Sequence, residues 1–227
     1  MNSQRFDFTG FSRIRIERAL SADILKADAY SVTIGDDFSR VRMEVIGDTL
    51  CIERRGIDWI SLFHGRPHIV ITVPLLREVT LGGACHGRVI GFQSDSEFAV
   101  KLVGACQMEI NAIAASSVKV EITGASNLSG DITYSGEAIF KILGASRAVL
   151  KGSGNSAQIE LAGASQAKFA ELALRRANLK CLGASSAQLR VSDNLDLTLV
   201  GASRLDYFGN PIIGQIQIAG ASTINHR

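Results

Sequence analysis

The stretch VKVEITGAS, residues 118–126, contains the pattern that decides the fold. Apolar residues at 118, 120 and 122 alternate with polar residues at 119, 121 and 123, and the run ends in Gly-Ala-Ser. Alternation with a period of two is typical of a β-strand that has one buried face. We therefore expect a strand here that stops at the tripeptide.

The tripeptide Gly-Ala-Ser, or Gly-Ala-Cys, occurs eight times between residues 83 and 222. Successive copies are 21, 20, 20, 19, 20, 18 and 19 residues apart. Their first residues are Gly83, Gly104, Gly124, Gly144, Gly163, Gly183, Gly201 and Gly220. Self-similarity at this period predicts a solenoid in which each repeat forms one coil.

The residues before each glycine show that the coils are made of strands. Two positions before the glycine stand Leu81, Leu102, Ile122, Ile142, Leu161, Cys181, Leu199 and Ile218. Four positions before it stand Val79, Val100, Val120, Phe140, Ile159, Leu179, Leu197 and Ile216. No window of ten residues keeps a helical period, and the leucine and asparagine pattern of leucine-rich repeats is absent. The sequence predicts an all-β fold, a right-handed parallel β-helix with coils of about 20 residues.

The eight glycines are predicted to be structural corners. Glycine adopts backbone angles closed to other residues, so it can turn the chain between two faces of a coil. Alanine and serine are small enough to stack on their copies one coil away, and a serine hydroxyl can bond nearby backbone. Cys85 and Cys106 replace serine in the first two corners and are expected to be neighbouring, reduced thiols.

The first third of the chain fits the pattern less well. Steps of nineteen back from Leu81 reach residues 62, 43 and 24, and the same steps from Val79 reach residues 60, 41 and 22. Gly65 and Gly47 would then take the corner position, and the ladder from Ile24 to Ile218 would hold about eleven coils. We expect one domain over 1–227, with regular coils over 78–227. Residues 1–77 are either irregular early coils or an N-terminal cap built as a β-meander.

Composition excludes several classes of protein. Mean hydropathy is +0.18, too high for a disordered chain. Because 24 Lys and Arg balance 22 Asp and Glu, we expect no nucleic-acid partner, and no run is apolar enough to span a membrane. The start, MNSQRFDFTGF, shows no signal peptide, so the sequence as given is compatible with a cytoplasmic protein.

The search for chemistry in the sequence finds no catalytic, cofactor-binding or metal-binding residues to assign. Nucleophile, phosphate-loop, zinc-protease and dinucleotide motifs are all missing. His64 and His68 would lie near His86 if the coil register holds, a weak metal set without a fixed acidic partner. The acids that a polysaccharide lyase or hydrolase would need are dispersed: Asp131, Glu137, Asp193, Asp196 and Asp206.

Taken with these motifs, the chain resembles the head GIN domain family of bacterial proteins, known as putative auto-transporter adhesins. The resemblance rests on FDFTGFSRIRI, YSVTI, GDTLCIE, ITVPLL and the repeated GAS, and it covers nearly the whole chain. It implies a right-handed parallel β-helix, often on exported or envelope-associated proteins, and it carries no catalytic residues. Cysteine in the first two corners and the missing export signal depart from the family pattern.

Two classes of function remain open. The first, which we favour, is a non-catalytic binding, adhesion-like or assembly module for a protein or glycan partner. The second is a carbohydrate-active enzyme with a groove beside the coils. The positions just before the glycines form an apolar line expected to face outward, which together with the last coil predicts a homo-oligomer, most simply a two-fold dimer. That line is Gly82, Val103, Thr123, Leu143, Ala162, Leu182, Val200 and Ala219.

Overall fold

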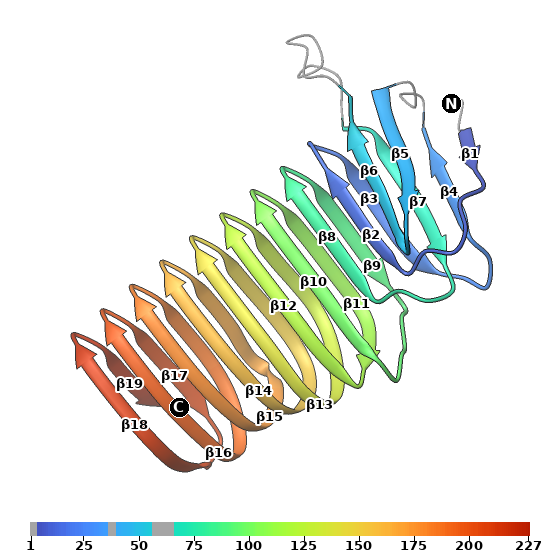
Figure 1. Cartoon of the computed structure of the whole chain (residues 1–227). Coiled ribbons are helices and arrows are strands. Elements are labelled where there is room, and N and C mark those ends of the chain that lie inside the picture. The colour runs from blue at the N-terminus through green and yellow to red at the C-terminus, as the bar shows by residue number, and fades with distance from the viewer. Residues whose placement is uncertain (1–3, 36–39, 56–65) are drawn as a thin grey trace.

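A computed structural model describes residues 4–35, 40–55 and 66–227, and this part of the chain is all-β (Figure 1). Hydrogen bonds join its strands into one continuous sheet that winds into a solenoid. The strands are β1 (Gln4–Phe6), β2 (Arg13–Glu17), β3 (Ser21–Lys26), β4 (Ser31–Ile34), β5 (Val41–Ile46), β6 (Thr49–Arg54), β7 (His68–Val73), β8 (Glu78–Gly83), β9 (His86–Ile90), β10 (Glu97–Gly104), β11 (Gln107–Ala115), β12 (Ser117–Gly124), β13 (Asn127–Gly144), β14 (Arg147–Gly163), β15 (Gln166–Gly183), β16 (Ser186–Gly201), β17 (Arg204–Phe208), β18 (Ile212–Gly220) and β19 (Thr223–His226).

From β8 onward the chain forms the predicted parallel β-helix, with about seven turns. Each strand pairs in parallel with the strand one repeat later, so that Leu102 faces Leu81 on one side and Ile122 on the other. β13, β14, β15 and β16 each bend once and cover two faces of a coil. The columns predicted from Leu81 to Ile218 are therefore confirmed.

The core lies inside the coils. Residues of the two apolar columns are buried as far as Leu199, because alternation turns every second side chain inward. Phe140 and Phe169 pack across adjacent coils with their ring centroids 4.9 Å apart. Full burial of such side chains contributes roughly 1.5–3 kcal/mol each to stability.

The Gly-Ala-Ser tripeptides form one edge of the solenoid, which we call the glycine corner. All eight of its glycines have positive φ, and a Cβ on Gly163 would lie 2.6 Å from the carbonyl oxygen of Gly144. The corner serines from Ser126 to Ser203 point inward and are buried, whereas Ser222 in the last corner is half-buried. Ser165 Oγ, for example, donates to the carbonyl oxygens of Gly144 at 3.2 Å and Ala162 at 2.7 Å. The hydroxyl column thus satisfies backbone groups of two neighbouring coils.

Cysteines take over the serine role in the first two corners. Cys85 Sγ lies 3.2 Å from the carbonyl oxygen of Gly82, and Cys106 Sγ lies 3.6 Å from that of Val103. The two residues are on adjacent coils and both thiols are free. Burial raises the pKa of both thiols, which keeps them protonated.

The backward extension of the columns is wrong. Leu81 and Val79 face Ile16 and Ile14 of β2, which in turn faces β6. Of the predicted positions, Ile24 and Ala22 lie in β3 on another face, Met43 and Val41 lie in the antiparallel strand β5, and Gly47 lies in the turn between β5 and β6. Ile60, Leu62 and Gly65 fall outside the described residues. The ladder from Ile24 to Ile218 with about eleven successive coils therefore does not exist.

The described N-terminal strands instead form two layers out of chain order. β2 pairs with both β6 and β8, and β3 pairs with both β7 and β9, so the β2–β3 segment lies between residues that follow it in sequence. Beyond β6 and β7, the strands β5, β4 and β1 continue the sheet in antiparallel pairs (Figure 1). The structure thus combines parallel layers and antiparallel cap strands.

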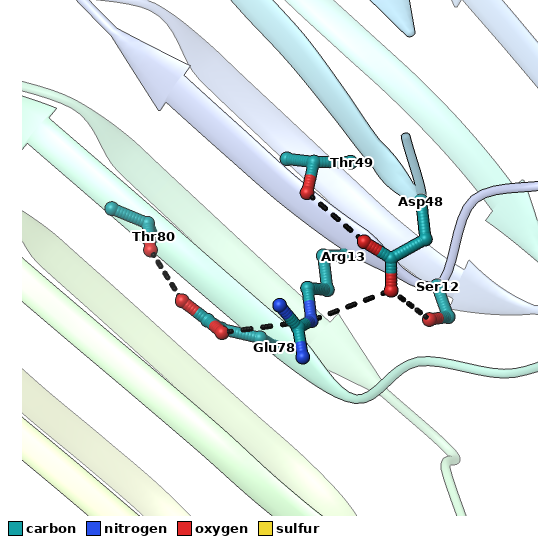
Figure 2. A network of polar contacts seen from close by, with 6 residues as sticks. All are labelled: Ser12, Arg13, Asp48, Thr49, Glu78 and Thr80. Atoms are coloured by element: carbon teal, nitrogen blue, oxygen red, sulfur yellow. Dashed lines mark hydrogen bonds and ion pairs between the residues drawn. The ribbon is translucent and has the colours of Figure 1, made fainter. Parts of the chain in front are cut away.

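A polar network ties the inserted layer to its two neighbours (Figure 2). Arg13 of β2 lies between two carboxylates, with its Nε 3.5 Å from Asp48 Oδ2 and 3.9 Å from Glu78 Oε2. The hydroxyl of Ser12 donates to Asp48, and the hydroxyl of Thr80 donates to Glu78. Arg13 is about half exposed, so these ion pairs add little to stability.

Candidate functional site

The outward columns next to the glycine corner carry alternating charge. Lys101, Glu121, Lys141, Glu160 and Lys180 face one another in register on successive coils. Lys180 Nζ lies 3.5 Å from Glu160 Oε1, and both side chains are well exposed. Opposite charges on neighbouring coils largely neutralise one another, so this column offers little net charge to a ligand.

A hollow of about 760 Å³ opens at the opposite side of the coils, where the long strands bend. Its lining comes from β13, β14, β15 and β16 and from the segment that follows β17. The size falls within the range of pockets that hold small ligands, roughly 300–1,000 Å³. We refer to this feature as the hollow.

One of the coils that line the hollow is poor in side chains. The sequence Gly-Ser-Gly at 152–154 places Gly154 between Tyr134 and Leu174 in the same column, while Ser153 faces Ala173. A Cβ on Gly154 would fall within the Tyr134 ring, so the ring occupies the space that a side chain would otherwise fill. In the next coil, Arg190 faces Ala173 and forms a wall of the hollow.

Two guanidinium groups border the hollow, each held through its Nε atom. Arg175 Nε lies 2.9 Å from Asp193 Oδ2, and Arg190 Nε donates to the carbonyl oxygen of Ala170 at 2.8 Å. The Arg190 guanidinium also lies over the ring of Phe208, 5.4 Å from its centroid. These contacts favour one orientation of each arginine side chain at the border of the hollow.

The carboxylate beside the hollow is fixed in its ionised form. Ser192 Oγ donates to Asp193 Oδ1 at 2.6 Å. This bond first, and then the Arg175 guanidinium, hold the pKa of Asp193 below its ordinary value. A carboxyl group in this state is a poor proton donor at neutral pH.

Tyr134 is buried at the hollow with 3% of its surface exposed. Its hydroxyl has no hydrogen-bond partner in the described part of the chain. Burial raises the pKa of this phenol, which therefore stays neutral and can donate one hydrogen bond. Buried hydroxyls in folded proteins are usually hydrogen-bonded, so this group is able to donate to a bound molecule that reaches it.

The predicted histidine cluster is only partly assembled. His68 and His86 face opposite edges of β3 at Ser21, and His64 lies outside the described residues. His68 Nε2 lies 3.3 Å from Asp23 Oδ2, but the guanidinium of Arg66 contacts the His86 ring. Over residues 4–35, 40–55 and 66–227, no three side chains of the metal-binding types come together.

Of the five dispersed acids, Glu137 and Asp196 line one open pocket of about 500 Å³, and each of the five has its own hydrogen-bond partner. Asp131 accepts from the backbone N–H of Ala112 and Asp196 from that of Gln215. The other three bond side chains: Glu137 with Gln158, Asp193 with Arg175, and Asp206 with Asn225 and Arg204.

The apolar line beside the glycine corner is unevenly exposed. Val103 and Val200 are 42% and 40% exposed, whereas Leu143 and Leu182 are half-buried. A second apolar surface lies on β18, where Ile212, Ile216 and Ile218 are exposed. Within the described residues no helix is both long and apolar enough to cross a bilayer.

The stacked parallel strands and the hollow at their bend define the class of the protein: it is a parallel β-solenoid with a pocket on its side. The chain belongs to the family described as "putative auto-transporter adhesin, head GIN domain", whose model matches residues 10–211. No curated protein matches the chain in sequence.

Solved structures share the fold at low sequence identity. A putative adhesin from Parabacteroides distasonis has a TM-score of 0.89 at 15% identity, over 100% of this chain and 96% of that one. A putative lipid binding protein from the same species has a TM-score of 0.71 at 18% identity, over 100% and 96%. A putative adhesin from Parabacteroides merdae has a TM-score of 0.67 at 17% identity, over 100% and 95%. These likenesses show the β-solenoid fold of the family.

Sequence reasoning missed the hollow and Tyr134. The available signal was the run KGSGNS at 151–156, where one coil has two glycines and no bulky apolar residue. A search for catalytic motifs passes over such a run, because Gly154 gives room to the Tyr134 ring and supplies no reactive group itself.

Proposed function

We propose that the protein is a non-catalytic, adhesion-like binding module whose ligand site is the hollow at the bend of β13–β16. The observation that carries the proposal is the hollow bordered by two arginines and lined by Tyr134, whose buried hydroxyl has no partner in the described part of the chain. Members of the fold described as adhesins or as lipid-binding support a binding role for the scaffold.

The chemistry of the lining favours binding over hydrolysis. A glycoside hydrolase needs two carboxyl groups that flank the scissile bond, one of them protonated at neutral pH. The described lining of the hollow contains no Asp or Glu, and nearby Asp193 is held ionised by Ser192 and Arg175. We therefore place the carbohydrate-active enzyme behind the binding module as the alternative.

The experiment compares the wild-type protein with Ala173→Leu, which fills the hollow from an exposed position. Both proteins are immobilised and exposed to a glycan array and to purified bacterial surface fractions. We expect a ligand that the wild type retains and the filled variant loses. Equal retention by both proteins would place binding elsewhere, and release of shortened glycans would indicate the enzyme instead.

We also propose that the protein self-associates, through the exposed isoleucines of β18 or through the apolar line. Ile216 and Ile218 are 52% and 50% exposed although the equivalent residues of earlier coils are buried. Contact between two such surfaces would bury apolar area and pair the backbone of neighbouring strands.

Light scattering at micromolar concentration tests this second proposal. We expect a dimer that Ile216→Lys converts to a monomer, with Val103→Lys as the matched change in the apolar line. Dissociation by the Val103 variant alone would assign the interface to the line. A monomeric wild type would contradict both routes.

A further inference from the structure

We infer that the hollow recognises an acidic saccharide, a hydroxyl-rich ligand that carries a carboxylate. This inference rests on the proposed binding function and specifies the ligand class for the same site. Three properties of the described lining carry it: an excess of positive charge, a set of uncommitted hydroxyl and amide groups, and a small apolar floor.

The charge favours an anion. Arg175 and Arg190 line the hollow without an accompanying Asp or Glu, and the adjacent Asp193 balances only one of them. Each arginine is anchored through Nε, and its terminal nitrogens make no bond within the described chain. A guanidinium whose terminal N–H groups have no other acceptor can donate two parallel hydrogen bonds to a planar carboxylate.

The neutral polar groups favour a ligand with several hydroxyls. Ser135, Ser153, Asn155 and Asn210 line the hollow with side chains that both donate and accept hydrogen bonds. The buried Tyr134 hydroxyl adds a donor with no partner in the described residues. Sugar hydroxyls also donate and accept, so they can satisfy this set, whereas an alkyl chain would leave it unpaired.

The floor completes the match. Ala173 supplies exposed apolar surface between the polar groups, next to the buried side chains of Leu174 and Val191. The C–H face of a sugar ring can pack on such a surface while its hydroxyls reach the rim. The geometry of small residues beneath two arginines therefore fits a carboxylated ring better than a compact inorganic anion.

Calorimetric titration of the full chain tests the inference with digalacturonic acid as the probe and galactobiose as its neutral counterpart. We expect the acid to bind at least about tenfold more tightly than the neutral sugar, the difference that loss of a charge-assisted contact gives. Sodium acetate should not compete at concentrations equal to the disaccharide, because it lacks the hydroxyls.

Variants of the lining assign the contacts. Arg190→Gln should weaken binding of the acid by about tenfold, and Tyr134→Phe by roughly three- to tenfold. Ala173→Leu should abolish it. Arg147→Gln is the matched control, because Arg147 lies outside the hollow and bonds Gln166. Circular dichroism confirms that each variant is folded before titration.

Three results would overturn the inference: equal affinity for the acidic and neutral sugars, no binding of either at millimolar concentration, or unchanged binding by Arg190→Gln and Ala173→Leu. If the glycan array or surface fractions still reveal a ligand that Ala173→Leu loses, only the ligand class is wrong and the proposed binding function stands. If they do not, both proposals fail.

Discussion

Substitution of Gly144 by alanine is the sharpest test of how the glycine corner works. The φ angle of Gly144 is 85°, and a Cβ there would collide with the carbonyl oxygen of Gly124 on the preceding coil. Positive φ costs a non-glycine residue about 1–2 kcal/mol. Displacing a packed neighbour adds about 1–3 kcal/mol, so we expect the free energy of unfolding to fall by roughly 2–5 kcal/mol.

Gly10 provides a matched control for the backbone contribution. Its φ is 76°, and a Cβ there would meet nothing within 4 Å. Gly10→Ala should therefore cost only the strain of positive φ, about 1–2 kcal/mol. The difference between the two variants isolates the crowding between stacked coils.

Thermal unfolding followed by far-UV circular dichroism measures both variants. At about 2–4 °C per kcal/mol for a chain of this size, Gly144→Ala should lower the melting temperature by roughly 4–20 °C and Gly10→Ala by roughly 2–8 °C. Equal shifts for the two variants would refute the crowding argument. An unchanged melting temperature for Gly144→Ala would refute the role of the corner altogether.

Three further predictions concern buried polar and ionisable groups. Ser165→Ala should lower the free energy of unfolding by about 1–2 kcal/mol in urea titrations, because the Ala162 carbonyl loses the hydroxyl donor and the Gly144 carbonyl keeps only the Ala164 N–H, and Ser165→Cys should lower it less. Burial raises the pKa of Cys181 to about 12 from 9.0, so stability should fall as pH rises above about 9, where only the unfolded chain releases the proton. Iodoacetamide at pH 8 should label Cys51 before Cys181, and the reverse order would contradict this burial. The Asn225 amide and then nearby arginines hold the pKa of Asp206 below 3.8. The contribution of the Asp206 carboxylate to stability is therefore lost as pH falls below that value, and amide hydrogen exchange in β19 should become faster.

The regular coils could be predicted from sequence because chain order and spatial order coincide there. Val100 faces Val79 and Val120, the residues one repeat before and after it. Any period in the sequence is therefore a period in space, and the alternation of apolar residues fixes which side is buried.

The N-terminal layers could not be predicted by the same rule. A step of one repeat back from Val79 assumes that the residues just before it in sequence lie beside it in the sheet. On that side, however, the residue paired with Val79 is Ile14. Alternation in β2 is as clear as in β8, yet alternation alone does not say which strand pairs with which. The hollow and Tyr134 were missed for another reason, since no pattern in the sequence marks Gly154 as the residue that makes room for the Tyr134 ring.

The insertion of β2 and β3 between later strands sets the order in which the protein can assemble. β2 needs β6 and β8 as neighbours, so it cannot reach its final pairing until residue 83 has been synthesised, and β3, which needs β7 and β9, must wait for residue 90. A solenoid made of consecutive coils can nucleate in any repeat and grow from there. Here growth from the first residue is blocked, and the repeats after Glu78 are the part that local contacts can fold first. The segment of β2 and β3 then inserts between the later strands. Its contacts join residues more than sixty positions apart in sequence, such as Ile14 and Val79.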